Sequence, residues 1–222
     1  MVDAGKRLRE VIRELRKIIE PGITTKFIDQ KAEEFIIKQG GEPSFNKVDD
    51  YSWSTCVPVN EQIVHTPPSD RVLLNGDLLT VDIGLYKQGF HIDFATSFIV
   101  GSNKDKNTLN FLKVGRDTLY QAIKVAIIGN HIGDISKVIQ TNIEGNKFNV
   151  SETLVGHGIG HDLHEDPLVP GILTTKIERT PKIEKGLVIA IEVICMMGKR
   201  KIVTEKDDTW SIKTADNSLS AC

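Results

Sequence analysis

Apolar residues in the first part of the chain recur every three or four positions, which is the spacing of one face of a helix. One such run covers residues 4–19 and stops at Pro21-Gly22. A second run covers residues 27–36 and can be capped by Thr24 or Thr25. The pattern therefore predicts two consecutive amphipathic helices.

A pair of strands joined by a turn-like stretch follows, at residues 78–84 and 91–100. If the turn is centred on Lys87-Gln88, Asp82 stands directly opposite Asp93 on one face of the hairpin. Like charges in that position repel, and a buried pair needs a shared proton or a cation. A slipped register or a bulge that separates the two carboxylates is the alternative.

The second half of the chain repeats the order of the first. A helix is expected over residues 107–126, a second one, capped by Asp134, ends near Gly145, and strand candidates follow at 186–197. Two similar halves indicate an internal duplication with a site where they meet, and coincidence between two ordinary helix pairs is the alternative. No linker or low-complexity stretch divides the chain, so residues 1–222 are expected to form one domain.

Composition narrows the functional class. The charge is nearly balanced, with 28 basic and 30 acidic residues, so nothing points to nucleic acid or to an anionic membrane surface. No apolar run approaches the roughly 18 residues of a membrane span, and the amino terminus begins with a charged helix in place of a signal sequence. Three widely spread cysteines fit a reducing compartment. We expect a soluble cytoplasmic protein.

The segment 156–167 is the most specific string in the chain. It places His157, His161 and His164 within eight residues and surrounds the first of them with glycines that permit tight turns. Catalytic or metal-binding use is the favoured interpretation, against ordinary surface or core histidines. Glu192 is the next unusual residue, because it interrupts an apolar strand where an unpaired carboxylate is costly to bury. An edge strand with Glu192 facing water is the alternative.

Together, Asp82, Asp93, His157 and Glu192 form an oxygen-rich set with one imidazole. Such a set suits Mn, Fe, Co or a pair of catalytic ions better than a structural zinc site. Two ions about 3.5–4 Å apart need a bridging carboxylate, and Asp93 is well placed to bridge. The sequence holds no nucleophile elbow, phosphate-binding loop or dinucleotide fingerprint, which argues against serine hydrolases, kinases and dinucleotide enzymes.

A series of short motifs follows one another along the whole chain. In order, they are Pro21-Gly22-Ile23-Thr24-Thr25, Val59-Asn60-Glu61-Gln62-Ile63-Val64-His65, Gly76-Asp77, Val81-Asp82-Ile83-Gly84, Gly89-Phe90-His91-Ile92-Asp93, Gly156-His157-Gly158-Ile159-Gly160, His164-Glu165, Ile191-Glu192, Trp210-Ser211-Ile212-Lys213-Thr214 and Ser218-Leu219-Ser220-Ala221. In their order and spacing, the chain resembles the type I methionine aminopeptidases over essentially its whole length. The resemblance implies a pseudo-twofold "pita-bread" α/β fold, an antiparallel sheet covered by two helix pairs, with the closing C-terminal strands absent.

For the metal site, the resemblance implies up to two divalent ions (Mn, Fe, Co or Zn). Asp82 would chelate one ion, Asp93 would bridge both, and His157 and Glu192 would complete the shell of the other. Glu192 would also act as the proton shuttle while a metal-bound hydroxide attacks the first peptide bond.

For the substrate, the resemblance implies that His65 and His164 contact the scissile amide and stabilise the tetrahedral intermediate. The methionine side chain would enter an apolar pocket, to which the family's pattern assigns Phe45, Tyr51, Cys56, Leu163 and Trp210. The expected partners are the N-termini of nascent polypeptides, with the ribosome as a further candidate, and the expected state is a monomer.

Three departures from the family pattern bear on activity. Thr66-Pro67-Pro68 follows His65 where glycine is usual, and Val193 follows Glu192 where proline is usual. The family also has a glutamate that bridges both ions shortly after the motif at 218–221, whereas this sequence stops at Cys222. We therefore expect a weakened second metal site. A catalytically impaired binding module that holds peptides or docks near ribosomes, and a proline-directed peptidase of the same fold, are the competing hypotheses.

Overall fold

The computed structural model describes residues 1–102, 105–206 and 208–222. The helices are α1 (Val2–Ile18), α2 (Thr25–Lys38), α3 (Lys106–Val125) and α4 (Ile132–Gly145), with short 3-10 helices η1 (Phe45–Lys47) and η2 (Ile177–Arg179). Among the described residues, none of the helices combines the length and apolarity that crossing a membrane requires. The four predicted helices are confirmed, and the first three agree with the prediction to within about two residues at each end, which is the usual scatter of helix boundaries. The fourth begins three residues earlier than predicted, because His131 is the N-cap residue and Asp134 lies in the first turn.

All strand pairs are antiparallel, and the described strands form four small sheets. The first sheet contains β1 (Glu42–Pro43), β4 (Leu78–Lys87), β2 (Thr55–Cys56) and β5 (Phe90–Ile99). The second contains β13 (Ser220–Ala221), β10 (Cys195–Met196) and β6 (Asn149–Val150), and the third contains β11 (Ile202–Thr204), β12 (Ile212–Thr214) and β3 (Gln62–Val64). The fourth contains β8 (Glu165–Val169), β7 (Gly156–Gly158) and β9 (Ile189–Ala190).

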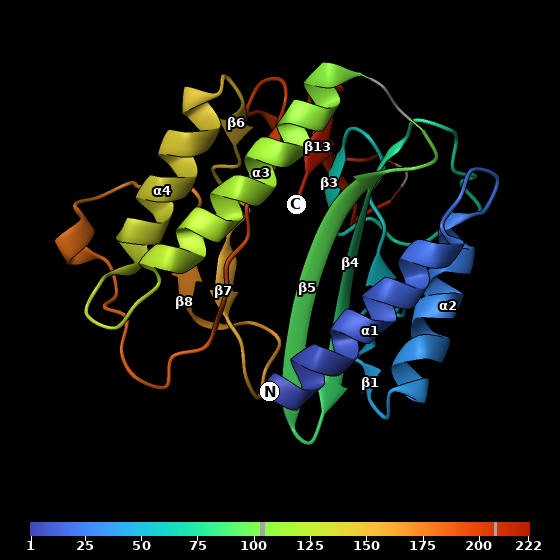
Figure 1. Ribbon diagram of the computed structural model, residues 1–222, viewed down its shortest axis with the longest axis horizontal. Helices are drawn as coiled ribbons and strands as arrows, with labels where there is room; N and C mark the ends of the chain where they lie inside the picture. Colours follow the sequence, from blue (N-terminus) through green and yellow to red (C-terminus); the bar gives the residue numbers. More distant parts are fainter. Residues whose placement is uncertain (103–104, 207) are drawn as a thin grey trace.

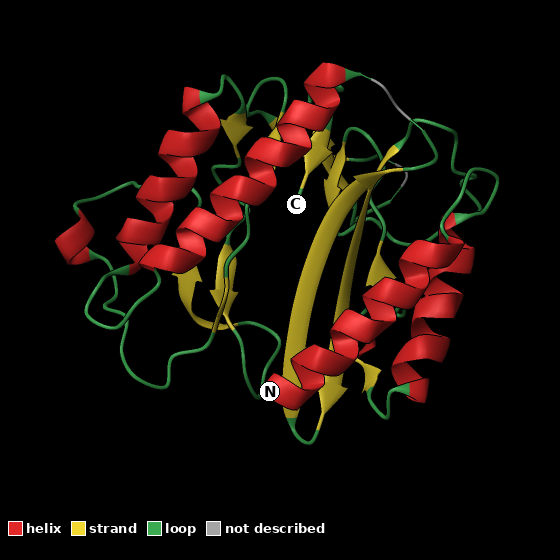
Figure 2. Cartoon of the chain, in the orientation of Figure 1, coloured by secondary structure: helices red, strands yellow, loops and turns green. Residues whose placement is uncertain are grey.

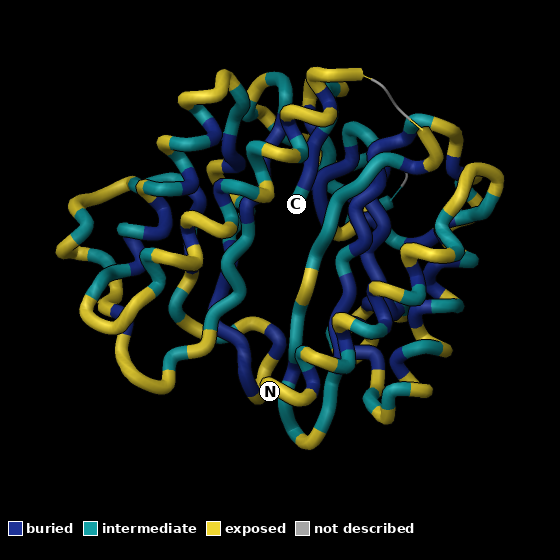
Figure 3. The backbone as a smooth tube through the Cα atoms, viewed as in Figure 1, coloured by how far each residue is buried: buried dark blue, intermediate teal, exposed yellow. Residues whose placement is uncertain are grey.

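The two helix pairs lie on opposite sides of the molecule, with the strands between and behind them (Figure 1, Figure 2). One apolar core joins α1 and α2 to β4, and a second joins α3 and α4 to strands of the second half. Exposed residues alternate with buried ones along the helices, while β4 is largely buried and β5 beside it is mostly half-buried (Figure 3). The predicted α/β architecture with two helix pairs over antiparallel strands is confirmed.

The joint between the helices is repeated in detail in the two halves. The amide of Gly22 donates to the carbonyl of Leu73 at 2.8 Å, and the amide of Gly129 donates to that of Ile183 at 3.0 Å. Both glycines have a φ of 99°, a left-handed value that favours glycine. The predicted repeat of this joint is therefore confirmed by matching backbone hydrogen bonds.

The hairpin turn lies one residue later than the predicted position. Lys87 pairs with Phe90, so the two central turn residues are Gln88 and Gly89. Both have positive φ, 53° and 83°, as a type I′ turn requires. This turn is favoured in two-residue hairpins because its twist matches that of the strands.

The shifted turn changes the predicted pairing of the two aspartates. Asp82 stands opposite Ala95, and Asp93 stands opposite Gly84, so the expected direct opposition is wrong. Moving the pairing by two residues keeps every side chain on its original face. Asp82 and Asp93 therefore share one face as diagonal neighbours, which is still within reach of their carboxylates.

The predicted strand over residues 186–197 is interrupted at its centre. It consists of β9 and β10, and Glu192 lies in the irregular backbone between them. Since β9 pairs with β7 while β10 pairs with β6 and β13, the chain leaves one sheet and enters another at this point. This crossing places Glu192 between the sheets, where it can turn toward the hairpin.

Candidate metal centre

Three of the predicted ligands meet between the two halves of the chain. The ligand atoms of Asp93, His157 and Glu192 all lie within 4.8 Å of one another. His157 Nε2 is 3.6 Å from Asp93 Oδ2 and 3.4 Å from Glu192 Oε1. The cluster thus combines β5 of the first half with β7 and the β9–β10 crossing of the second.

The glycines beside His157 fix the position of its ring. A Cβ at Gly156 would overlap the carbonyl oxygen of Ala190, and one at Gly158 would overlap that of Asp166, so β9 and β8 can lie this close only against glycine. His157 Nδ1 is 2.8 Å from the carbonyl oxygen of Gly158 and donates to it. This bond leaves Nε2 as the atom that faces the two carboxylates.

Protonation in the cluster follows from burial and from the crowding of charge. Burial lowers the pKa of His157, but the nearby carboxylates of Asp93 and Glu192 outweigh burial and raise that pKa to about 10. Burial raises the pKa of Glu192, although its contact with His157 opposes the shift. Carboxylates this close together are stable only with a proton or a cation among them. A divalent ion with oxygen and nitrogen ligands fits this donor set.

Asp82 extends the cluster along the hairpin. Its carboxyl group lies close enough to that of Asp93 for the two to interact. Burial, followed by the negative charge of Asp93, raises the pKa of Asp82 well above its usual range. Asp82 lies outside the compact group of three, so the four predicted ligands are adjacent but not equivalent.

Two further histidines border the cluster. The ring of His164 packs edge-on against that of His157 with a centroid distance of 4.3 Å. His65 directly follows β3 and has a left-handed backbone with a φ of 57°. Burial is the main cause of a lowered pKa in both, which keeps their imidazoles neutral near pH 7.

The residues predicted for the pocket gather in a single apolar cluster, here called the apolar pocket cluster. Tyr51 packs edge-on against Trp210 at 5.1 Å, and its hydroxyl lies 3.1 Å from Cys56 Sγ. The buried members of this cluster are Phe45, Tyr51, Cys56, Ile159 and Leu163, with Met1, Val48, Trp53 and Trp210 packed against them. Sequence reasoning missed Ile159, although it stands within the glycine-rich motif that was singled out.

The apolar pocket cluster adjoins the metal-ligand cluster at Gly84. A Cβ at Gly84 would lie 2.5 Å from Ser44 Cβ and 2.7 Å from Phe45 Cε1, so the Phe45 ring covers this position. Gly84 stands opposite Asp93 and two residues from Asp82, on their face of the hairpin. The apolar surface therefore begins directly beside the candidate ligands.

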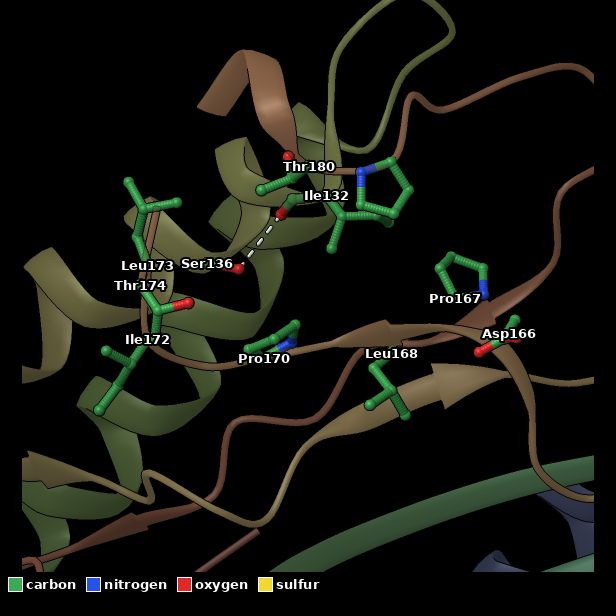
Figure 4. A pocket seen from close by; sticks show the side chains of 11 residues that line it. Ile132, Ser136, Asp166, Pro167, Leu168, Pro170, Ile172, Leu173, Thr174 and Thr180 are labelled. Carbon is green, nitrogen blue, oxygen red and sulfur yellow. Dashed lines mark hydrogen bonds between the residues drawn. The ribbon is translucent and has the colours of Figure 1, made fainter. Parts of the chain in front are cut away.

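A cavity of about 450 Å³ lies elsewhere, between the start of α4, β8 and the segments that follow it (Figure 4). None of the predicted site residues lines this cavity. Two of the hydroxyl groups that line it already have partners in the fold: Ser136 donates to the carbonyl of Ile132, and Thr180 to that of Ile177. The cavity therefore offers no candidate for the chemistry indicated by the cluster.

Comparison with known proteins gives consistent relationships over the whole chain. The sequence matches the model of metallopeptidase family M24 over residues 1–217. A methionine aminopeptidase of Clostridium perfringens is 40% identical over 221 residues, 100% of this chain and 87% of that one. Methionine aminopeptidase 1 of Bacillus subtilis is also 40% identical, with 100% and 88% covered. The crystal structure of a methionine aminopeptidase from Thermotoga maritima superposes with a TM-score of 0.94 at 36% identity, covering 100% of this chain and 88% of that one.

Proposed function

Because the chain belongs to metallopeptidase family M24, we propose that it is a metal-dependent aminopeptidase that removes the N-terminal methionine from polypeptides. The observation that carries this proposal is the meeting of Asp93, His157 and Glu192 beside the apolar pocket cluster. Both halves contribute to this site, which supports a single functional domain over residues 1–222.

Divalent ions would be held by the four clustered ligands. Asp93, His157 and Glu192 would hold one ion, and Asp82 with a shared Asp93 would hold a second one more weakly, because these residues give it fewer ligands. Mn, Fe, Co and Zn all suit carboxylate and imidazole donors, and titration with each ion would rank their affinities. When bound, such ions lower the pKa of water and polarise a peptide carbonyl.

The side chains around the ions would handle protons and orient the substrate. Glu192 is the proposed proton shuttle, because its raised pKa lets it accept a proton from water and return it to the leaving amine. His65 and His164 are proposed to hydrogen-bond the scissile amide as neutral imidazoles and to stabilise the charge that develops on its oxygen.

The substrate would enter with its first residue buried. The methionine side chain is proposed to occupy the apolar pocket cluster, and the free amino group to lie toward Asp82. Nascent polypeptides in the cytoplasm are the proposed substrates of a monomeric enzyme, with the ribosome as a candidate partner. A soluble protein with a nearly balanced charge is consistent with this setting.

The test is release of methionine from peptides that begin Met-Ala or Met-Leu, with Mn or Co supplied. We expect cleavage of the Met-Ala peptide, and loss of cleavage in Asp93→Asn. The matched control is His131→Asn, which removes a histidine at the start of α4, where asparagine is a good N-cap residue. Cleavage of an Xaa-Pro peptide instead would indicate a proline-directed peptidase. Binding without cleavage of any peptide would indicate a peptide-binding module.

A further inference from the structure

His91 is a buried histidine that the proposed mechanism leaves unused. It is 7% exposed and stands on β5 two residues before Asp93, so both side chains lie on the same face of the hairpin. Its ring packs against that of Tyr86 at 4.7 Å. A buried imidazole needs a hydrogen-bond partner, and the identity of that partner indicates what His91 does.

The partner on the first half of the chain is Ser44. Ser44 Oγ and His91 Nδ1 are 2.6 Å apart, and Ser44 is completely buried. The amide of Ser44 also donates to the carbonyl of Gly84 at 3.1 Å. Since Phe45 follows directly and its ring covers Gly84, these two bonds hold that wall of the apolar pocket cluster against the hairpin.

The partner on the second half is the glycine-rich loop. The backbone amide of His91 donates to the carbonyl of Gly160 at 2.8 Å. Ile159 and Leu163, which are the second wall of the apolar pocket cluster contributed by the second half of the chain, lie one residue before and three residues after that glycine. His91 therefore bonds to Ser44 beside one wall and to Gly160 beside the other. Only one residue separates His91 from Asp93 in the sequence.

We propose that His91 is a positioning residue that sets the apolar pocket cluster at a fixed place relative to the metal ligands. The proposal rests on the proposed aminopeptidase function and deepens it, because this spacing selects which first side chain reaches the scissile bond. The side-chain bond to Ser44 is the separable part, since the backbone bond to Gly160 survives substitution. The Ser44 hydroxyl can donate to Nδ1 when the ring carries its proton on Nε2.

The test compares Ser44→Ala and His91→Phe with the conservative variant His91→Asn. Phenylalanine keeps a ring against Tyr86 but has no hydrogen-bond acceptor, whereas asparagine retains a polar atom close to the position of Nδ1. The matched control is Ser97→Ala, which removes a hydroxyl from the same face of β5 at a distance from both pocket walls, where it bonds to Thr80 and Cys222. The melting temperature of each variant is measured alongside the kinetics.

We expect Ser44→Ala and His91→Phe to raise KM for a Met-Ala peptide about three- to tenfold, with kcat within about twofold of the starting value. Discrimination between Met-led and Leu-led peptides should fall by a similar factor, and His91→Asn should restore most of it. A merely structural role would lower kcat with the folded fraction and leave KM and discrimination unchanged, and that result would overturn the proposal.

A second readout separates this inference from the proposed function. Both tryptophans of the chain, Trp53 and Trp210, pack against the apolar pocket cluster, so their fluorescence reports binding of free L-methionine without hydrolysis. If the starting protein binds methionine but cleaves nothing, the proposed function fails, and weaker binding in Ser44→Ala with unchanged binding in Ser97→Ala still supports the inference. A protein that neither binds nor cleaves overturns both.

Discussion

Binding of a divalent ion at the candidate centre should expel a proton from His157. In the metal-free protein, the carboxylates of Asp93 and Glu192 outweigh burial and raise the pKa of this imidazole to about 10. An ion can bind only the neutral imidazole, in which Nε2 carries no proton. Near pH 7 only about one protein molecule in a thousand has His157 in this form. The apparent affinity should therefore rise about tenfold for each pH unit, up to the pKa of His157.

Calorimetric titration of Mn or Co into the metal-free protein measures the apparent affinity and the number of protons released. Titrations between about pH 6.5 and pH 8, in buffers of different ionisation enthalpy, count the protons released with each ion. We expect at least one proton per ion in the starting protein and in the control His131→Asn, which leaves the cluster intact. An affinity that does not change with pH, or release of no protons, would refute the electrostatic reasoning.

The raised pKa of His157 also predicts how the stability of the metal-free protein changes with pH. The pKa of His157 is raised from 6.5 in the unfolded chain to about 10 in the folded protein. A raised histidine pKa contributes stability that is fully present below the unfolded value and is lost as the pH rises through the folded value. The melting temperature of the metal-free protein should therefore fall from about pH 7 to pH 10, and a bound ion should remove most of that dependence.

Three further substitutions test other parts of the structure. Asp82→Asn removes a buried carboxyl group whose ionised form is disfavoured beside Asp93, so it should raise the melting temperature of the metal-free protein while weakening binding of a second ion in the same calorimetric titration. Gly84→Ala forces the Phe45 ring to move and should raise KM for Met-led peptides; an unchanged KM would contradict the assigned pocket wall. Thr24→Ala removes the hydroxyl that caps α2 and should cost about 1 kcal/mol in denaturant unfolding, with unaltered metal binding.

The hairpin shows how far local pattern can take a prediction. Alternation along the strands correctly placed Asp82 and Asp93 on one face, because side chains alternate strictly with backbone position. The register was wrong, because it depends on which two residues take up the turn. Gln88 adopts a positive φ although it is not glycine, and its sequence carries no signal for that conformation.

The helix pairs were predictable because helical periodicity and terminal residues are local properties. Thr24 caps α2 through a 3.1 Å bond from the amide of Phe27, and Asp134 accepts from the amide that precedes α4. The strand around Glu192 was predicted as continuous because the residues on both sides of Glu192 are apolar. Its interruption is set by a change of strand partners, and those partners lie far away in the sequence.

The sequence by itself determined the helix pairs, the repeated joint and the chemical types of the candidate ligands, since each is encoded within a few neighbouring residues. Only the tertiary structure decided that Asp93, His157 and Glu192 meet within 4.8 Å while Asp82 stands beside them. It also revealed the bond between His91 and Ser44, 47 residues apart. Contacts of this kind arise from packing the two halves together, and packing depends on the geometry of the whole chain.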